Sequence, residues 1–378
     1  MPPLTDSPSQ TEHDVLIVGG GIHGCALARE LALRGRDVVV LEKSVPGAEA
    51  SSAAGGILGP HLEADHGKRF LDFGRYSLGL YPRWIQALES ESGVSTGFRP
   101  CGGIRACFNP ESLGALKAQA ATWEADGLPV HWCDASELRE IEPRIGEALG
   151  GIRCPEEAQV DPRALMKALT IAARRSGVRF VMDRVVGIEA EEALSVRCAS
   201  GLRRAKQVVV AAGAWSATLP GCGLPQGAVQ PARGQMLMLK LPEPPCGSVI
   251  FSERGYAVAR PDGHVLVGST LEFEGFQKGV TAEGMSEILA MALQMLPALA
   301  KAKFVDAWSG FRPWTTDHLP IVGPAEPRGL WLSTGHYRNG ILLAPGSAAL
   351  LADMMSGVEA AIDASAFAAT RITRPDPS

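Results

Sequence analysis

The 378-residue sequence lacks several features that would indicate a membrane protein, a metal protein or a secreted one. No apolar run reaches the roughly 18 residues of a membrane-spanning helix. The eight cysteines contain no Cys-x-x-Cys pair, so we expect neither a zinc ribbon nor a redox pair, and no metal site. Residues 1–13 lack the basic and apolar regions of a signal peptide. Reduced cysteines and a cytoplasmic location are therefore expected.

The sequence also lacks a large excess of either sign of charge. The chain has 36 Lys and Arg against 41 Asp and Glu, a formal net charge of −5. A weakly acidic balance with interspersed signs argues against nucleic acid or an anionic membrane as a partner. The hydrophobic share of 46% is that of a globular chain, and the length predicts two or three domains at about 150 residues each.

Glycine, in contrast, is in excess, with 43 residues. The usual share is about 7%, so this chain has either many tight turns or several places where backbone approaches a ligand closely. The first such place follows the apolar run 14–18, which is typical of a parallel strand buried on both faces. Residues 22–34 then have helical spacing, and 37–41 is a second buried strand. This order predicts a βαβ unit with two parallel neighbouring strands.

The loop of this unit has the pattern Gly19-x-Gly21-x-x-Gly24 and is followed by Glu42 at the end of the second strand. The first glycine allows a tight turn, the second lets backbone approach a pyrophosphate, and the third lets helix and strand pack closely. The helix N-terminus favours phosphate, and an acidic residue at Glu42 would bond ribose hydroxyls. We therefore predict a dinucleotide site. Glu42 disfavours the 2′-phosphate of NADP but leaves NAD and FAD open.

The rest of the chain alternates between two kinds of structure. A helix with Asp161 as N-cap and Pro162 at its first position, running on through 163–176, continues the α/β pattern, as do a strand over 178–182 and an apolar strand that runs into Gly213. Amphipathic helices over 113–126 and 136–141 precede them, and alternating strands surround a helix over 281–296 further on. The last elements are a strand over 329–334 and a helix over 341–355.

This alternation predicts an α/β plus α+β fold. A Rossmann-like FAD-binding or dinucleotide-binding domain with a parallel sheet is interleaved with a substrate domain built on a mixed or antiparallel sheet. We assign 14–80, 155–220 and 312–360 to the first domain and 81–154 and 221–311 to the second. Residues 1–13 and 361–378 are expected to be tails.

Two arginines near the C-terminus indicate an anion site. Arg312 ends a strand in an apolar setting, which suits a bidentate carboxylate clamp. Arg338 lies in the segment from Gly335 to Ile341, between a strand and a helix N-terminus suited to negative charge. The alternative to an anion site is that Arg312 or Arg338 is a surface arginine in an ion pair, which is the more common role of a single arginine.

Together these segments resemble the D-amino-acid-oxidase-type flavoproteins. The loop with Glu42, the small residues 51–56, the strand 209–215 and both arginine motifs carry the resemblance, which covers about 14–357. Within that family, the eleven residues 335–345 are most similar to the glycine oxidases of thiamine biosynthesis.

The resemblance implies FAD as cofactor and places Arg312, Tyr256 and Arg338 at the substrate carboxylate. With the glycine loop, it gives these cofactor-binding residues: Gly19, Gly21, Ile22, His23, Gly24, Glu42, Lys43, Ala50, Ser51, Gly55, Gly56, Ile57, Val185, Gly213, His336, Tyr337, Arg338, Asn339, Gly340, Ile341 and Leu342. Some relatives tether flavin through a C-terminal cysteine. No cysteine follows Cys246, so we expect FAD to be held non-covalently.

The implied reaction is oxidative deamination of glycine, sarcosine or small D-amino acids. Hydride passes to flavin N5, and the imine hydrolyses to glyoxylate and ammonia while oxygen becomes hydrogen peroxide. The product would supply thiazole synthesis, and the protein is expected to be a homo-oligomer whose partners are a small amino acid and molecular oxygen. Trp314 and His318 depart from the family pattern, which leaves the size of the substrate pocket open.

Three alternatives stay open at this stage. The first is a D-amino-acid or sarcosine dehydrogenase that uses an electron acceptor other than oxygen. The second is the FAD-containing part of a tRNA-modifying enzyme, which would call for a basic face or a fused methyltransferase domain. The third is a NAD-binding module without flavin, which would show no visible flavin absorbance.

Overall fold

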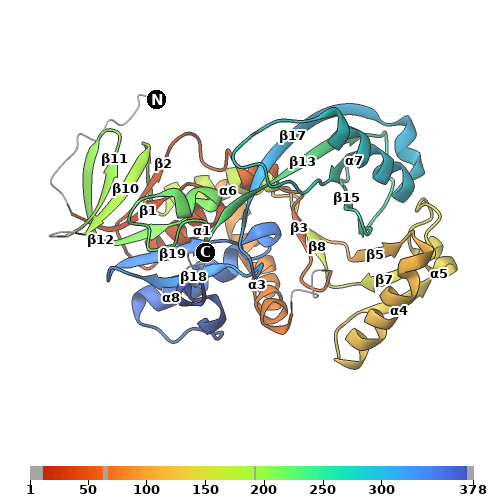
Figure 1. Ribbon diagram of the computed structural model, residues 1–378, viewed down its shortest axis with the longest axis horizontal. Helices are drawn as coiled ribbons and strands as arrows, with labels where there is room; N and C mark the ends of the chain where they lie inside the picture. The colour runs from red at the N-terminus through yellow and green to blue at the C-terminus, as the bar shows by residue number, and fades with distance from the viewer. Residues whose placement is uncertain (1–11, 63–66, 191–192, 373–378) are drawn as a thin grey trace, which may run out of the picture.

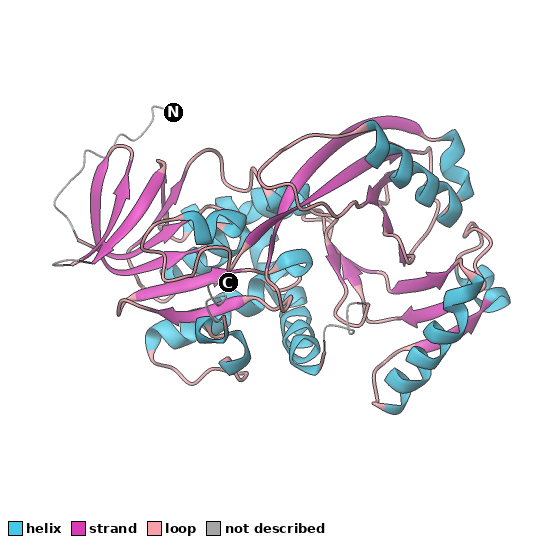
Figure 2. Cartoon of the chain, viewed as in Figure 1, coloured by secondary structure: helices cyan, strands magenta, loops and turns pink. Residues whose placement is uncertain are grey.

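The computed structural model describes residues 12–62, 67–190 and 193–372. Two large sheets occupy the two halves of the molecule, and a small sheet of order β3-β8-β4 lies between them (Figures 1 and 2). The strands of the first sheet are β1 His13–Val18, β2 Val38–Glu42, β9 Arg179–Met182, β10 Val185–Ala190, β11 Leu194–Cys198, β12 Gly201–Val210, β18 Ile321–Ala325 and β19 Leu330–Thr334. Those of the small sheet are β3 Ile57–Leu58, β4 Arg99–Pro100 and β8 Ala158–Gln159.

The first sheet has the predicted parallel core. β1 pairs in parallel with both β2 and β12, β2 pairs in parallel with β9, and β12 with β19. Alternate residues of β1 belong to different cores: Val15 and Ile17 pack with the helices, whereas Leu16 and Val18 pack with β10, β11 and β12. Both faces of the strand are thus buried, which explains its uninterrupted apolar run.

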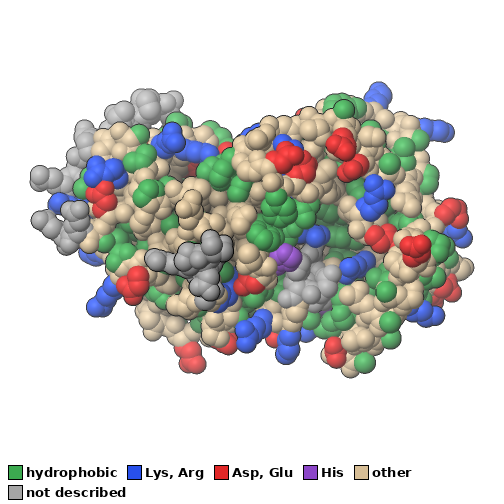
Figure 3. Space-filling view, in the orientation of Figure 1, with side chains coloured by type: hydrophobic (Ala, Val, Ile, Leu, Met, Phe, Trp, Pro, Cys, Tyr) green, Lys and Arg blue, Asp and Glu red, His purple; other side chains and the backbone are tan. Residues whose placement is uncertain are grey.

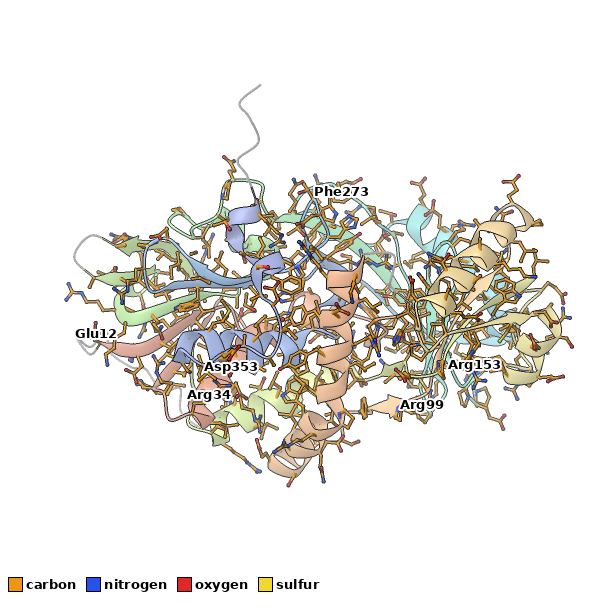
Figure 4. All side chains as sticks on the ribbon, turned by 90° about the horizontal axis from the view of Figure 1, so that it is seen from below. Glu12, Arg34, Arg99, Arg153, Phe273 and Asp353 are labelled. Carbon is orange, nitrogen blue, oxygen red and sulfur yellow. The ribbon has the colours of Figure 1, made fainter. Side chains whose placement is uncertain are left out.

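Helices cover one face of this sheet (Figure 1). They are α1 Ile22–Leu33, α3 Lys68–Ser92, α6 Pro162–Arg175 and α8 Ala344–Ser356. The predicted start of α6 is confirmed, because the Asp161 carboxylate accepts hydrogen bonds from the backbone N–H groups of Arg163 and Ala164 at 2.8 and 3.1 Å. At the outer edge, Arg34 after α1 and Asp353 of α8 form an ion pair at 2.8 Å (Figure 4).

The second sheet is mixed, as expected for the substrate half. Its strands are β5 Gly103–Cys107, β6 His131–Asp134, β7 Gly150–Cys154, β13 Gln230–Lys240, β14 Val249–Phe251, β15 Tyr256–Ala259, β16 His264–Gly268 and β17 Lys303–Trp314. All neighbours are antiparallel except β14 and β5. Three helices pack beside it: α4 Pro110–Ala125, α5 Ala135–Ile141 and α7 Ala282–Met295. The long strands β13 and β17 arch across the top of the molecule (Figure 1).

Three expectations need correction. The segment 80–154 contains four strands, β4 to β7, besides its helices, because short strands of two to five residues give little periodicity. The last helix begins at Ala344, not at Ile341: Tyr337–Asn339 forms a 3₁₀ turn, η4, and Pro345 favours the first turn of a helix. In the expected C-terminal tail, the short helix Ser365–Phe367 packs against the core, and the Phe367 ring lies 4.7 Å from that of Phe73 at a tilt of 38°.

Within the described residues, no helix combines the length and the hydropathy needed to cross a bilayer.

Candidate active site

A cavity of about 880 Å³ opens at the carboxyl ends of the parallel strands. Val18, Glu42 and Thr334 line it from the ends of β1, β2 and β19. This is the edge at which open α/β sheets bind ligands. The cavity extends from Val185 of the first sheet to Tyr256 of the second, so one ligand there would touch both halves. In the space-filling view, hydrophobic side chains gather in the recess between the halves (Figure 3).

The structure brings nearly all of the predicted site residues to this cavity. Those that line it are Gly19, Gly21, Ile22, His23, Glu42, Lys43, Ala50, Ser51, Gly55, Gly56, Ile57, Val185, Gly213, Tyr256, Arg312, His336, Tyr337, Arg338, Asn339, Gly340 and Ile341. Two predicted cofactor residues are not in its wall. A side chain on Gly24 would lie 2.0 Å from the carbonyl of Gly19, so Gly24 packs α1 against the loop. Leu342 is buried, and its carbonyl accepts a hydrogen bond from Ser77 at 2.7 Å.

The glycine loop presents backbone to the cavity. Gly19 has a φ of +109°, and a Cβ there would lie 2.5 Å from the carbonyl oxygen of Ala211, so both conformation and space require glycine. At the N-terminus of α1, the backbone N–H of Ile22 donates to the Ser51 hydroxyl at 2.9 Å. Ser51 therefore lies where a helix N-terminus favours an anionic group.

Glu42 is held in place at the end of β2. Its carboxylate accepts hydrogen bonds from the backbone N–H groups of Gly20 at 2.8 Å and Ser44 at 3.0 Å. Because both donors come from turns beside the cavity, the carboxylate is oriented before any ligand binds. This is the position and chemistry that a ribose diol needs.

Two histidines stack at the wall of the cavity. The rings of His23 and His336 lie 3.3 Å apart, at 13° to each other. Burial lowers the pKa of His23 to about 3. Burial and then His23 itself hold the pKa of His336 well below its usual range, so both rings are neutral at neutral pH. His336 Nε2 bonds the Ser347 hydroxyl at 3.0 Å, whereas Nδ1 of His336 has no hydrogen-bond partner among the described residues.

These features fit a flavin dinucleotide. An unpaired buried nitrogen calls for a polar partner, and the cavity beside His336 is where a ligand would supply one. Gly55 brings its loop against Tyr256, since a Cβ on Gly55 would lie 2.8 Å from the tyrosine ring. Gly310 similarly faces Ala53. At Gly55 and Gly310 the wall of the cavity therefore lacks a side chain, which leaves room beside a flat ring system, while the glycine loop and Glu42 suit the nucleotide end.

Arg312 and Tyr256 lie at the other end of the cavity. Arg312 extends from β17 over Gly234 and donates hydrogen bonds to the carbonyl of Thr270, at 3.2 Å, and to the hydroxyl of Ser269. Tyr256 begins β15, and its hydroxyl lies 3.3 Å from Met236 Sδ. Both residues also line a second, adjoining cavity of about 250 Å³, as does Arg338. The three predicted substrate residues thus meet at one place.

Trp314 and His318 lie in a chain of aromatic contacts outside the cavity walls. Trp314 packs edge-on against Phe273 at 5.1 Å and lies 6.1 Å from His318, whose ring is 5.2 Å from that of Tyr337. Phe273 is half exposed at the surface (Figure 4). These two departures from the family pattern therefore line neither cavity, and His318 contacts Tyr337, which lines both.

Sequence reasoning missed three arginines near the site. Arg105 and Arg254 line the smaller cavity. Arg260 is buried at the end of β15 and donates to Gln159 Oε1 at 2.7 Å and to the carbonyl of Gly55 at 3.0 Å. It thereby ties the second sheet to the loop at the cofactor cavity, and burial lowers its pKa. None of the three lies in a local sequence motif. Only the three-dimensional structure therefore identifies them as residues near the site.

The described residues bring together no three His, Cys, Asp or Glu side chains that could hold a metal ion. No cysteine lines either cavity within the described part of the chain.

Comparison with known proteins gives a consistent result. The model of the FAD dependent oxidoreductase family, DAO, matches residues 14–354. Glycine oxidase from Geobacillus kaustophilus is 35% identical over 365 residues, 95% of this chain and 97% of that protein. Its crystal structure superposes with a TM-score of 0.92 over 96% of this chain and 99% of the other, at 34% identity.

The bifunctional protein ThiO/ThiG of Trichormus variabilis is 37% identical over 350 residues. This match includes 90% of the present chain but 52% of the bifunctional protein, so the chain spans about half the length of such relatives. The family model, the relatives and the fold agree with a cavity that suits FAD. The chain belongs to the family of FAD dependent oxidoreductases of the D-amino-acid-oxidase type.

Proposed function

We propose that the protein is an FAD-dependent amine oxidase that acts on glycine and related small amines. One observation carries the proposal: a single cavity begins at the glycine loop and ends at Arg312, Tyr256 and Arg338. Relatives named glycine oxidase support it at 32 to 35% identity over more than nine-tenths of the chain. The products would be glyoxylate, ammonia and hydrogen peroxide.

The side chains at this end of the cavity hold and orient the substrate. Arg312 presents a planar guanidinium that can bind a carboxylate through two parallel hydrogen bonds. The Tyr256 hydroxyl can donate to the same group, and Arg338 adds positive charge at the rim. Fixing the carboxylate aims the α-carbon toward the cofactor cavity, and such orientation is a large part of catalysis. FAD, when bound, supplies the chemistry that accepts a hydride and returns the electrons to oxygen.

Among the described residues, every carboxylate that lines the smaller cavity already accepts hydrogen bonds from the protein. Glu253 is the one acidic residue among those lining the smaller cavity. Its Oε1 accepts hydrogen bonds from the backbone of Phe108 at 3.1 Å and from the Ser112 hydroxyl at 2.9 Å, both at the start of α4. Hydride removal from a neutral amine needs no such base, so the arrangement suits an amine that binds uncharged.

The test is hydrogen peroxide release from the FAD-loaded enzyme with glycine, sarcosine and D-alanine. Oxidase activity with glycine is expected. Arg312→Ala should lower kcat/KM for glycine by about a hundredfold, because one charge-assisted bidentate contact is worth roughly 3 kcal/mol. Arg328→Ala, on an exposed turn, is the matched control and should change little. Oxidation that proceeds with an artificial electron acceptor and releases no peroxide would instead identify the dehydrogenase.

We further infer the cellular setting. All eight cysteines are free thiols in the structure, which supports the reducing cytoplasm. Relatives that join ThiO to ThiG support a role in supplying thiazole synthesis for thiamine. Non-covalent binding of FAD and assembly into a homo-oligomer remain predictions. The interleaved domain division stays a proposal as well: the two sheets give its basis, although α3 runs across the proposed boundary at residue 80.

A further inference from the structure

Arg312 reaches across the second sheet to a segment on the far side of β13. Its own strand, β17, pairs with one edge of β13, and β16 pairs with the other. The guanidinium lies over Gly234 of β13, where a Cβ would come 2.3 Å from Nη2, so only glycine leaves the room it needs. Nη1 donates to the carbonyl of Thr270 at 3.2 Å, and Nη2 donates to the hydroxyl of Ser269. The two residues that follow β16 therefore hold two nitrogens of the guanidinium and fix its plane.

The Thr270 side chain is itself held at two points. Its hydroxyl accepts a hydrogen bond from the backbone N–H of Gln235, at 2.9 Å, and donates to the carboxylate of Glu272. A hydroxyl has one hydrogen to donate, so its donor is spent on Glu272. The carbonyl that receives Arg312 belongs to the same residue, and its position therefore depends on this hydroxyl.

Glu272 is in turn fixed to β13. Its backbone exchanges two hydrogen bonds with that of Arg233, at 2.8 and 3.0 Å. Its Oε2 accepts a hydrogen bond from Arg233 Nε at 2.9 Å, and its Oε1 accepts one from Gln235 Nε2 at the same distance. Arg233 and Gln235 are both buried. A buried network whose members satisfy one another rigidifies the structure around it.

Gln235 connects the same network to a helix. Its Oε1 accepts a hydrogen bond from the backbone N–H of Thr281 at 2.8 Å, and its Nε2 donates to the Thr281 hydroxyl at 3.1 Å. Thr281 is the N-cap of α7, where its hydroxyl accepts a hydrogen bond from the Gly284 N–H at 3.1 Å. Arg312 is thus linked through Thr270 and Gln235 to the sheet and to the helix beside it.

We propose that Thr270 is a positioning residue for Arg312. Its hydroxyl, bound to Gln235 and Glu272, fixes the carbonyl that orients the guanidinium toward the substrate carboxylate. A bidentate contact needs two parallel N–H bonds, so it is sensitive to any tilt of the guanidinium plane. A misplacement of about 1 Å can cost about a hundredfold in rate. The proposal rests on the proposed function in one respect, namely that Arg312 binds the carboxylate.

Binding is tested with two variants of one side chain. Thr270→Val keeps its shape and removes the hydroxyl, whereas Thr270→Ser keeps the hydroxyl. The FAD-loaded protein is titrated in a calorimeter with methoxyacetate, a carboxylate that has no amine to oxidise. Thr270→Val should raise the Kd about fivefold, the factor of one hydrogen bond, and Thr270→Ser should raise it by less than about twofold.

Thr122→Val is the matched control, because it removes an exposed hydroxyl on α4, and it should leave the Kd unchanged. An unchanged Kd in Thr270→Val, or an equal rise in both Thr270 variants, would overturn the proposal.

A double-mutant cycle on kcat/KM for glycine tests whether Thr270 acts through Arg312. This ratio is measured below saturation, so weak binding by Arg312→Ala does not prevent the measurement. Thr270→Val should lower kcat/KM about fivefold in the wild type, mainly through KM, and by less than about twofold in Arg312→Ala. An equal loss in both backgrounds would show that Thr270 acts independently of Arg312 and would overturn the proposal.

The two measurements separate this proposal from the proposed function. Weaker binding of methoxyacetate by Thr270→Val, without any amine oxidation by the wild type, would uphold the proposal and refute the proposed function. Glycine oxidation by the wild type, together with unaltered methoxyacetate binding in Thr270→Val, would do the reverse.

Discussion

The two ends of the long cavity are built by different means. At the nucleotide end, glycines bring backbone close, and Glu42 is the fixed acidic group. At the substrate end, arginine and tyrosine side chains from separate strands and turns line the walls. The first end is therefore sensitive to volume, because an added methyl group meets backbone. The second end is sensitive to charge and hydrogen bonding, because its walls leave room.

The largest effect is expected from a methyl group at the nucleotide end. In Gly24→Ala, the new Cβ would lie 2.0 Å from the Gly19 carbonyl oxygen, so the loop must move. We expect a cost of more than about 4 kcal/mol, the range of the most disruptive substitutions, and loss of FAD from the purified protein. The ratio of flavin to protein absorbance measures this. Gly79→Ala, at an open position of α3, is the control and should keep full FAD content.

Normal FAD content in Gly24→Ala would contradict the assignment of that loop to the cofactor.

An intermediate effect is expected at the stacked histidines in the wall of the cavity. Burial lowers the pKa of His23 to about 3, while in the unfolded chain it is near 6.5. Between pH 6.5 and pH 3, the unfolded state therefore binds the proton more readily than the folded state. The contribution of His23 to the free energy of unfolding is complete above about pH 6.5 and falls as the pH drops toward 3. The loss is about 1.4 kcal/mol per pH unit for one such group.

Urea unfolding of the FAD-free protein at pH 6 and pH 4 tests this. The fall in unfolding free energy between these pH values should be smaller in His23→Leu by about 2 to 3 kcal/mol. His131→Gln, which removes an exposed histidine, should behave as the wild type. The same pH dependence in His23→Leu and in the wild type would show that His23 is not a buried neutral group.

The smallest effect is expected from a single hydroxyl at the substrate end. Tyr256→Phe keeps the ring beside Gly55 and removes one donor to the carboxylate. One hydrogen bond is worth about 1 kcal/mol, so kcat/KM for glycine should fall about fivefold, mainly through KM. Steady-state kinetics with glycine measures it, and FAD content should not change. A loss as large as that of Arg312→Ala would mean that Tyr256 does more than bind the carboxylate.

This contrast also explains what could be predicted from the sequence. The glycine loop, α1 and Glu42 follow one another in the chain, so local spacing was enough to predict the βαβ unit and its ligand class. The parallel sheet followed from runs such as 14–18, which are apolar on both faces. Arg312 and Arg338 suggested an anion site locally, but their roles came from the family resemblance.

Other features had no local signal. Arg105, Arg254 and Arg260 meet the cavities because strands distant in sequence pair with one another, and no spacing reports such a pairing. The strands β4 to β7 were missed because each is too short to show a period. The start of α8 was placed three residues early because a 3₁₀ turn precedes Pro345.

The central claim is that one cavity holds FAD at one end and an amino acid at Arg312 at the other. Anaerobic addition of glycine to the FAD-loaded protein, followed by its visible spectrum, tests this most directly. We predict that the flavin absorbance bleaches in the wild type and remains in Arg312→Ala at the same glycine concentration. A wild-type spectrum that glycine leaves unchanged, although dithionite bleaches it, would contradict the account.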